Sequence, residues 1–233
     1  YSSDWPTDGP QRYGSIFHDI TSISLTPAIG FKPTEWLSFG GTFSYHLTDY
    51  RSYRAFDFGP FVARQEGVDP DSVPREDPGN EGREYLEFTG EAFGWSAGVT
   101  FMPGDFRIGA AYHSPIDLDL AGQYKLFIPN NEFYERRLVR DITRPADLHT
   151  RWPSEVRAGV GWSNDEGVEL EADVTWTHWS MVDAIEIDAE EQQGGPKLDQ
   201  KRPLDCNDTF EIRAGAHFPV AQQIDVGVEA GFE

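Results

Sequence analysis

Six basic or imidazole side chains stand at polar positions of alternating segments, where they could bind the carboxylate of a substrate. They are His46, Arg107, His113, Arg157, Arg213 and His217. A cation that faces the inside of a barrel must be solvated or paired, and a ligand carboxylate is one possible partner. Cross-strand ion pairs are the alternative, and their role would be structural. Such pairs would join Arg157 to Glu169 or Glu171, and Arg213 to Asp225 or Glu229.

Aromatic side chains gather in the long polar segments between the alternating ones. Phe56, Phe58, Phe61, Phe127 and Phe133 are candidates for an apolar groove that captures a hydrophobic ligand. The alternative is that these rings pack the long segments against one another. The two interpretations do not exclude each other.

The sequence contains no motif that predicts catalysis or metal binding. It has no G-x-S-x-G, no H-E-x-x-H and no phosphate-binding glycine loop. The acidic stretch 66–87 departs from the EF-hand spacing, so a solvated loop is the better interpretation. Cys206 is the single cysteine, which excludes a disulfide within the chain and a cysteine-rich metal site. We therefore expect neither an enzyme nor a bound cofactor or metal ion.

The elements that must position these residues are predicted by a period of two, which places alternate side chains on opposite faces of a strand. Eight segments show it: 22–31, 37–47, 93–101, 106–113, 155–162, 168–177, 210–218 and 224–232. We expect the fourth segment to continue to Tyr124, with Leu118 and Leu120 on the same face as Phe106. No segment shows a convincing helical period. The pattern predicts an all-β chain.

The connections between these segments alternate in length. Short turns are expected at 32–35, 103–105, 163–167 and 219–223, and long polar loops at 48–91, 114–154 and 178–207. This arrangement is typical of an antiparallel transmembrane β-barrel of outer-membrane type, with short periplasmic turns and long extracellular loops. A soluble barrel or sandwich with its apolar face inward is the alternative. Aromatic residues near the segment ends, such as Trp36 and Phe232, resemble membrane-interface girdles and favour the membrane barrel.

The charge balance excludes further classes of protein. The chain of 233 residues has 19 Lys and Arg against 40 Asp and Glu, a formal net charge of −21. A surface this acidic repels phosphate, so we expect no nucleic-acid partner. No window approaches the about 20 consecutive apolar residues that a transmembrane helix requires. Only 38% of the residues are hydrophobic, as expected if every second strand residue meets lipid.

Three stretches resemble the long-chain fatty-acid transporter family of the outer membrane, which includes toluene and xylene uptake channels. They are 23–45, 94–124 and 153–183, and the most specific pieces are FRIGAAYHSP at 106–115 and DVTWTHWS at 173–180. The resemblance implies a fourteen-stranded barrel in the bacterial outer membrane, blocked by an N-terminal hatch. It further implies passive transport of hydrophobic small molecules, in contact with outer-membrane lipid and lipopolysaccharide.

The sequence departs from the family pattern in the number of its elements. About eight strands are apparent, and no hatch segment can be identified. We therefore expect residues 1–233 to form a single β-barrel domain that is a fragment without the hatch and the terminal strands. A complete eight-stranded barrel is the alternative. Two other functions stay open at this point: a structural or adhesive barrel with acidic surface loops, and a small soluble barrel that binds a ligand.

Overall fold

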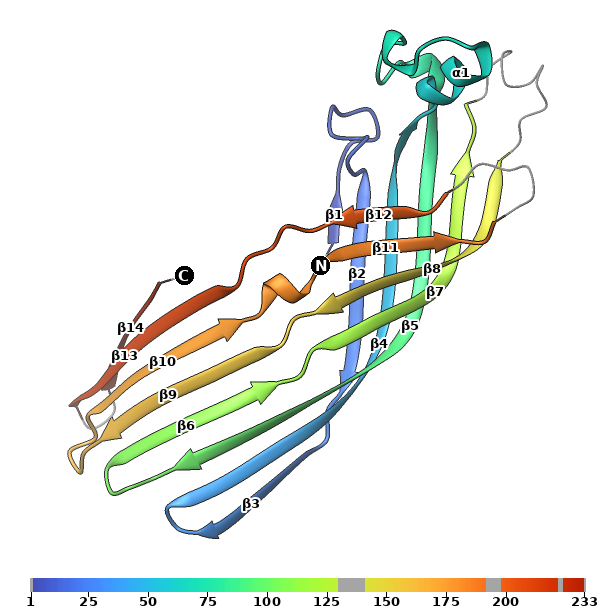
Figure 1. The fold of residues 1–233 in the computed structure, drawn as a ribbon. Coiled ribbons are helices and arrows are strands. Elements are labelled where there is room, and N and C mark those ends of the chain that lie inside the picture. Colours follow the sequence, from blue (N-terminus) through green and yellow to red (C-terminus); the bar gives the residue numbers. More distant parts are fainter. Residues whose placement is uncertain (1, 130–140, 192–197, 222–223, 233) are drawn as a thin grey trace.

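The computed structural model describes residues 2–129, 141–191, 198–221 and 224–232, which form one antiparallel β-sheet (Figure 1). Its strands are β1 (Ser2–Asp4), β2 (Phe17–Leu25), β3 (Ala28–Thr34), β4 (Leu37–Asp57), β5 (Glu81–Phe101), β6 (Phe106–His113), β7 (Ile116–Phe127), β8 (Ile142–Trp152), β9 (Glu155–Ser163), β10 (Glu169–Thr177), β11 (Ala184–Ala189), β12 (Gln200–Pro203), β13 (Thr209–Ala221) and β14 (Ile224–Phe232). The helical elements are α1 (Gly59–Glu66) and three 3-10 turns, Pro70–Ser72, Pro78–Asn80 and Trp179–Met181. The all-β antiparallel prediction is confirmed.

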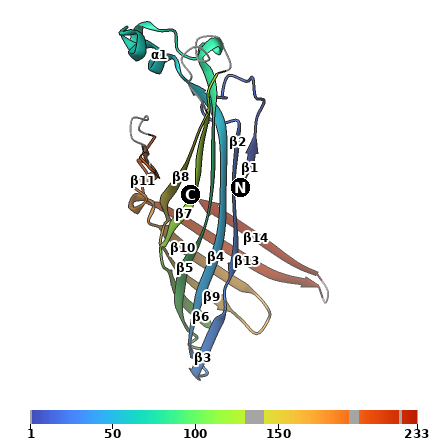
Figure 2. The ribbon, with the colours of Figure 1, turned by 90° about the vertical axis from the view of Figure 1, so that its right-hand side faces the viewer.

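The strand order is β12-β11-β8-β7-β5-β6-β9-β10-β13-β14, with β4 beside β5, and β2 and β3 beside β4. The sheet is twisted and curved, and its described edges do not pair with each other to close a cylinder (Figure 2). The turns that follow β3, β5 and β9 lie at one end of the sheet, and α1 lies at the opposite end (Figure 1). The predicted turn 219–223 includes residues 222 and 223, which lie outside the described residues. The predicted alternation of short turns and long connections is therefore confirmed.

The long connections contain more strand than the sequence predicts. Strands β4 and β5 each run for 21 residues and pair along their whole length, from Leu37–Phe101 to Asp57–Glu81. Strands β8, β11 and β12 lie within the predicted loops, so the estimate of about eight strands is wrong for the 14-stranded sheet. The predicted strand 22–31 is divided at Thr26–Pro27 into β2 and β3, both paired with β4.

Two regions of the sheet differ in where they place apolar side chains. The belt comprises β3, β6, β9, β10, β13, β14 and the lower parts of β4 and β5 (37–47 and 93–101). Its outward face carries exposed apolar residues, including Phe39, Phe43, Phe93, Trp95 and Ile108. Its inward face carries Ser, Thr, Gly and charged residues. The soluble barrel with an inward apolar face is therefore wrong for the belt.

The second region, the extension, comprises the upper parts of β4 and β5 (48–57 and 81–92) with β7, β8, β11 and β12. Here the apolar side chains point inward and form a buried core that includes Leu86, Phe88, Leu118, Leu120 and Leu148. The outward positions carry ion pairs such as Arg151–Asp117 and Lys125–Glu87. The extension is thus built like a water-soluble domain, whereas the belt is built for lipid.

At the junction of β6 and β7, the side chains that point inward change from the odd-numbered to the even-numbered residues. Ser96 of β5 pairs with His113, whereas Thr89 pairs with Ala121, so β6–β7 contains one residue more than β5 over this stretch. A shift of one residue turns every following side chain to the other face. Leu118 therefore points inward, and the prediction that it shares a face with Phe106 is wrong.

Candidate functional site

The inward face of the belt carries a wide groove with a volume of about 660 Å³. One row of directly paired residues crosses this groove from strand to strand: Gly30, Gly40, Gly98 and Ala111, followed by Arg157. We call the first four residues the glycine furrow. None of them has a side chain larger than a methyl group. The furrow therefore leaves a smooth path along the inner wall that ends at a guanidinium group.

The residues beside the furrow are small and polar. Thr42 and Ser96 flank it on one side and share a hydrogen bond of 2.6 Å between their hydroxyl oxygens. Ser38 and Thr100 pair on the other side. A Cβ added at Gly40 would meet no atom closer than 3.7 Å, so packing within the described residues does not require glycine there. Glycine inside a strand is destabilising by roughly 0.5–1 kcal/mol relative to alanine, and here it keeps the groove wide.

A second cavity of about 290 Å³ lies where the belt meets the extension. It is lined by His46, His113, Ser44, Ser114 and Ile116, among others. The His46 ring meets Trp152 edge-on at 5.6 Å between centroids. Its Nε2 atom is buried and has no hydrogen-bond partner among the described residues. A buried nitrogen in this state is stabilised by a bound polar group, so the cavity is a candidate for the polar end of a ligand.

The structure brings together only some of the six predicted basic and imidazole residues. His46 and His113 share the cavity, and His113 and Arg157 both line the groove. Arg107, Arg213 and His217 occupy other inward positions, opposite Gly161, Asp173 and Glu169 respectively. The predicted ligand role of all six stays a prediction.

Arg157 and Arg213 each bind an acidic residue of their own strand. Arg157 binds Glu155, and Arg213 donates to Glu211 at 2.6 Å, each acidic residue standing two positions earlier on the same face. The predicted pair of Arg157 with Glu169 or Glu171 is wrong, because the register places these residues opposite Ser163 and Gly161. Arg213 stands opposite Gly231, and the side chains of Asp225 and Glu229 lie outside the described residues.

Three of the five aromatic candidates, Phe56, Phe58 and Phe61, lie in or against the core of the extension. Phe58 is 4% exposed and contacts Phe56 and Phe61 at 5.0 and 6.4 Å between ring centroids. These three rings therefore pack against one another, which is the alternative interpretation given for them above. Phe127 is exposed at the end of β7, and Phe133 lies outside the described residues. The capture groove stays a prediction.

Sequence reasoning missed a buried cluster in the extension, formed by Arg54, Glu84, Tyr124 and Gln200. Arg54 donates to both carboxylate oxygens of Glu84, at 2.6 and 3.0 Å, and Tyr124 donates its hydroxyl to the same carboxylate. Burial alone would raise the pKa of Glu84, but the hydrogen bonds with Arg54 lower it overall. The signal in the sequence is Glu84 at an inward position, two residues before Leu86.

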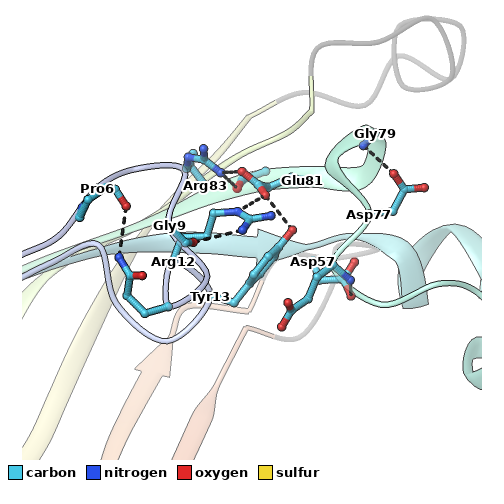
Figure 3. Close-up of polar contacts among 12 residues, drawn as sticks. Pro6, Gly9, Arg12, Tyr13, Asp57, Asp77, Gly79, Glu81 and Arg83 are labelled. Atoms are coloured by element: carbon cyan, nitrogen blue, oxygen red, sulfur yellow. Dashed lines mark hydrogen bonds and ion pairs between the residues drawn. The ribbon is translucent and has the colours of Figure 1, made fainter.

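A second polar cluster joins the N-terminal segment to the top of the extension (Figure 3). Glu81 accepts hydrogen bonds from Arg12 at 2.6 Å and from Tyr13 at 2.7 Å, and it also binds Arg83. Burial acts to raise the pKa of Glu81, but these three donors outweigh it and lower the pKa to about 2. Burial and the neighbouring carboxylate raise the pKa of Tyr13 to about 12.

None of the helices in the described part of the chain is long and apolar enough to cross a membrane. Within the same part of the chain, no group of three or more His, Cys, Asp or Glu side chains is placed to hold a metal ion.

Comparison with known proteins identifies the family. Residues 1–232 match the model of the family described as outer membrane protein transport protein (OMPP1/FadL/TodX). The chain belongs to this family. Like other OMPP1/FadL/TodX proteins it is located in the outer membrane, and the apolar belt is the part that meets lipid. The resemblance derived from the sequence is therefore confirmed.

Solved structures support the OMPP1/FadL/TodX fold. A Pseudomonas aeruginosa FadL homologue is 21% identical with a TM-score of 0.81, and the alignment covers 98% of this chain and 53% of that one. The Ralstonia pickettii toluene transporter TbuX is 17% identical with a TM-score of 0.66, over 93% of this chain and 56% of that one. The Pseudomonas putida toluene transporter TodX is 16% identical with a TM-score of 0.62, over the same shares. The chain thus spans about half the length of these structures, and no curated protein matches it.

Proposed function

We propose that this chain forms the wall of a channel that carries hydrophobic molecules passively across the bacterial outer membrane, without changing them chemically. The observation that carries this proposal is the combination of an outward apolar belt with an inward groove that is kept clear by glycine. The family of outer-membrane transport proteins supports it, as do structural neighbours named toluene transporters. In this arrangement the extension projects toward the exterior, and the short turns face the periplasm.

The glycine furrow suggests how an apolar molecule moves along this wall. Neighbouring strands lie about 4.8 Å apart, so the three spacings from Gly30 to Ala111 span roughly 14 Å. The floor of the furrow offers backbone and methyl groups, and on one side the hydroxyl groups of Thr42 and Ser96 are hydrogen-bonded to each other. An apolar molecule that moves past these two hydroxyl groups does not leave them without a hydrogen-bond partner. Arg157 lies at the charged end and His113 lines the same groove, so a carboxylate or hydroxyl of the substrate would bind there.

An uptake measurement with matched variants tests the proposal. The intact protein in liposomes should admit labelled dodecanoate or toluene faster than protein-free liposomes. Gly109→Phe projects a ring into the groove, because the nearest atom to an added Cβ is 3.8 Å away. Ala110→Phe places the same ring on the outward face. We expect Gly109→Phe to reduce uptake at least tenfold and Ala110→Phe to leave it within twofold.

If the intact protein gives no uptake above protein-free liposomes, the transport proposal fails. If uptake occurs but both variants behave alike, the groove is not the path of the substrate.

A further inference from the structure

The cavity that His46 lines, which we call the His46 cavity, adjoins the groove of the belt. Thr42, Ser96 and His113 line both the cavity of about 290 Å³ and the groove of about 660 Å³. The glycine furrow crosses the same groove. One molecule can therefore lie with its apolar part along the furrow and its polar end beside His46.

The polar groups around the His46 cavity are hydroxyl and imidazole groups. Among the described residues that line it, none is Asp, Glu, Lys or Arg. Three of the hydroxyl groups have partners, since Thr42 and Ser96 bond to each other and Ser114 accepts from the Trp95 amide at 2.9 Å. The buried Nε2 atom of His46 has no hydrogen-bond partner in the described part of the chain. The atom that most needs a partner is therefore an imidazole nitrogen, and the described lining supplies no Lys or Arg to neutralise an anion.

A hydroxyl group is the ligand group that suits this nitrogen best. The nitrogen donates when it carries a proton and accepts when it does not, and a hydroxyl group can complement it in both states. A carboxylate can only accept, and burying its charge without a cation is costly. The Trp152 ring meets the His46 ring edge-on at 5.6 Å between centroids and helps to fix its position. The His46 cavity therefore favours an uncharged polar end.

The groove also offers a carboxylate little compensation for its charge. Arg157 is the only Lys or Arg among the described residues that line the groove, and Glu155 already binds its guanidinium group. Asp173 lines the same groove and adds another negative charge. Two carboxylates thus accompany one cation, so the local charge repels an anionic ligand. An uncharged ligand does not experience this repulsion.

We propose that the molecules carried along this wall are uncharged hydrophobic molecules with one hydroxyl group, such as alkylphenols, and that His46 selects them over carboxylates. This substrate class rests on the proposed function. The hydroxyl group binds the Nε2 atom of His46, and the apolar remainder lies along the glycine furrow. A site built to hydrogen-bond a hydroxyl group discriminates strongly against an analogue that lacks it.

Three ligands of matched shape test this selection: 4-hexylphenol, hexylbenzene and 4-hexylbenzoate. Their dissociation constants are measured with the intact protein in lipid nanodiscs, and empty nanodiscs correct for partition into lipid. We expect 4-hexylphenol to bind at least fivefold more tightly than each of the other two. An affinity for 4-hexylphenol that does not exceed both others overturns the proposal without any variant.

Matched variants test the role of His46. His46→Phe keeps a ring and removes the nitrogen, so 4-hexylphenol should lose at least fivefold in affinity and then bind like hexylbenzene within twofold. His149→Phe makes the same substitution on the outward face of the extension, where His149 meets Asp119 at 2.7 Å, and should retain the preference. Glu155→Gln releases Arg157 and should raise the affinity for 4-hexylbenzoate at least threefold. Circular dichroism of each variant shows whether the sheet is retained.

The outcomes separate this proposal from the transport proposal. If a folded His46→Phe protein keeps the preference for 4-hexylphenol, His46 does not select the ligand, and transport is unaffected. If Glu155→Gln leaves 4-hexylbenzoate unchanged, Glu155 does not mask Arg157 and the argument against carboxylates fails. If liposome uptake fails while the nanodisc preference holds, the transport proposal falls and the binding preference stands.

Discussion

Strand β5 passes through both regions of the molecule, and its two halves use the same two faces in opposite ways. In the extension Phe88 is 0% exposed on the inward face, and in the belt Phe93 is 56% exposed on the outward face. The backbone alternation is unbroken between them, because both halves pair with β4 in one register. What differs is the medium outside the wall, which is water for the extension and lipid for the belt. The comparison shows that burial in this chain must be judged region by region.

We expect the largest effect from removing one residue at the β6–β7 junction, because the extension would then lose its inward apolar face. Deletion of Pro115 removes the additional residue and turns the side chains of β7 to the opposite face. Leu118 and Leu120 would then point to water, so we expect the extension not to assemble. Limited proteolysis should cut within 81–92 and 116–127, which the unmodified protein protects.

Pro115→Ala is the control for that deletion, since it keeps the number of residues. It should retain the resistance to protease. If the deletion variant is as resistant as the unmodified protein, the register does not decide which face of β7 is buried.

The next largest loss of stability is expected from replacing one of two phenylalanines on β5, Phe88 and Phe93. Phe88→Ala removes a fully buried ring and should destabilise the extension by about 3–5 kcal/mol. Phe93→Ala removes a ring that faces lipid and whose centroid lies 5.8 Å from that of Phe43 and 5.3 Å from that of Tyr45. We expect this loss to destabilise the belt by about 1 kcal/mol. Hydrogen exchange of the β5 amides measures both. Equal losses of protection would show that the two halves of the strand are not stabilised differently.

Alanine substitution of one glycine in each region, Gly122 in the extension and Gly109 in the belt, compares how closely the two regions are packed. A Cβ at Gly122 would lie 1.9 Å from the Glu87 carbonyl oxygen, a backbone atom that cannot move aside alone. Gly122→Ala should therefore cost about 1–3 kcal/mol in the extension. In the belt, a Cβ at Gly109 would meet no atom closer than 3.8 Å, so Gly109→Ala should be neutral or stabilising by about 0.5–1 kcal/mol. Denaturant unfolding followed by hydrogen exchange separates the two, and a destabilising Gly109→Ala would contradict the open groove.

Acid should loosen the top of the extension before it affects the belt. The pKa of Glu81 is lowered to about 2 in the folded protein, so its stabilising effect is complete above the ordinary carboxyl range. The effect is lost as the pH falls from that range toward 2, because protonation then favours the unfolded segment. The Ala55 amide, which donates to the Arg12 carbonyl at 2.8 Å, reports this contact through its exchange protection factor.

Glu81→Gln is the matched variant for the acid effect. Its protection factor at Ala55 should be lower at neutral pH and should lose the component that depends on acid. An unchanged acid response in Glu81→Gln would assign that response to another group.

The belt could be predicted from the sequence, and much of the extension could not. The segments of the belt alternate strongly, with Phe, Trp, Val and Ile against Gly, Ser and Thr, and the family match supports them. In the extension the inward face of β5 includes Gly82 and Glu84 beside Leu86 and Phe88, so the period is weak. A carboxylate on a buried face looks like a solvent-exposed loop position until Arg54, Tyr124 and Gln200 are seen around it.

The candidate site shows the same division. The sequence placed His46, His113 and Arg157 on one face of their strands, because side-chain direction within a strand is local. The furrow needed the register between strands, which sets Gly30, Gly40, Gly98 and Ala111 in one row. The partners of Arg157 also depended on register, and the acidic residue on its own strand took precedence over those on β10.

The sequence by itself determined that the chain is an antiparallel β-protein with short turns at one end and strands that alternate apolar and polar side chains, a pattern that favours a membrane barrel over a soluble one. These properties follow from periodicity, turn residues and composition, which act over a few neighbouring residues. Only the tertiary structure decided which face of β7 is buried, which residues cross the groove, and how Arg54, Tyr124 and Gln200 surround Glu84. Each of these depends on which strand lies beside which and in what register, and a single additional residue between β6 and β7 is enough to reverse the answer.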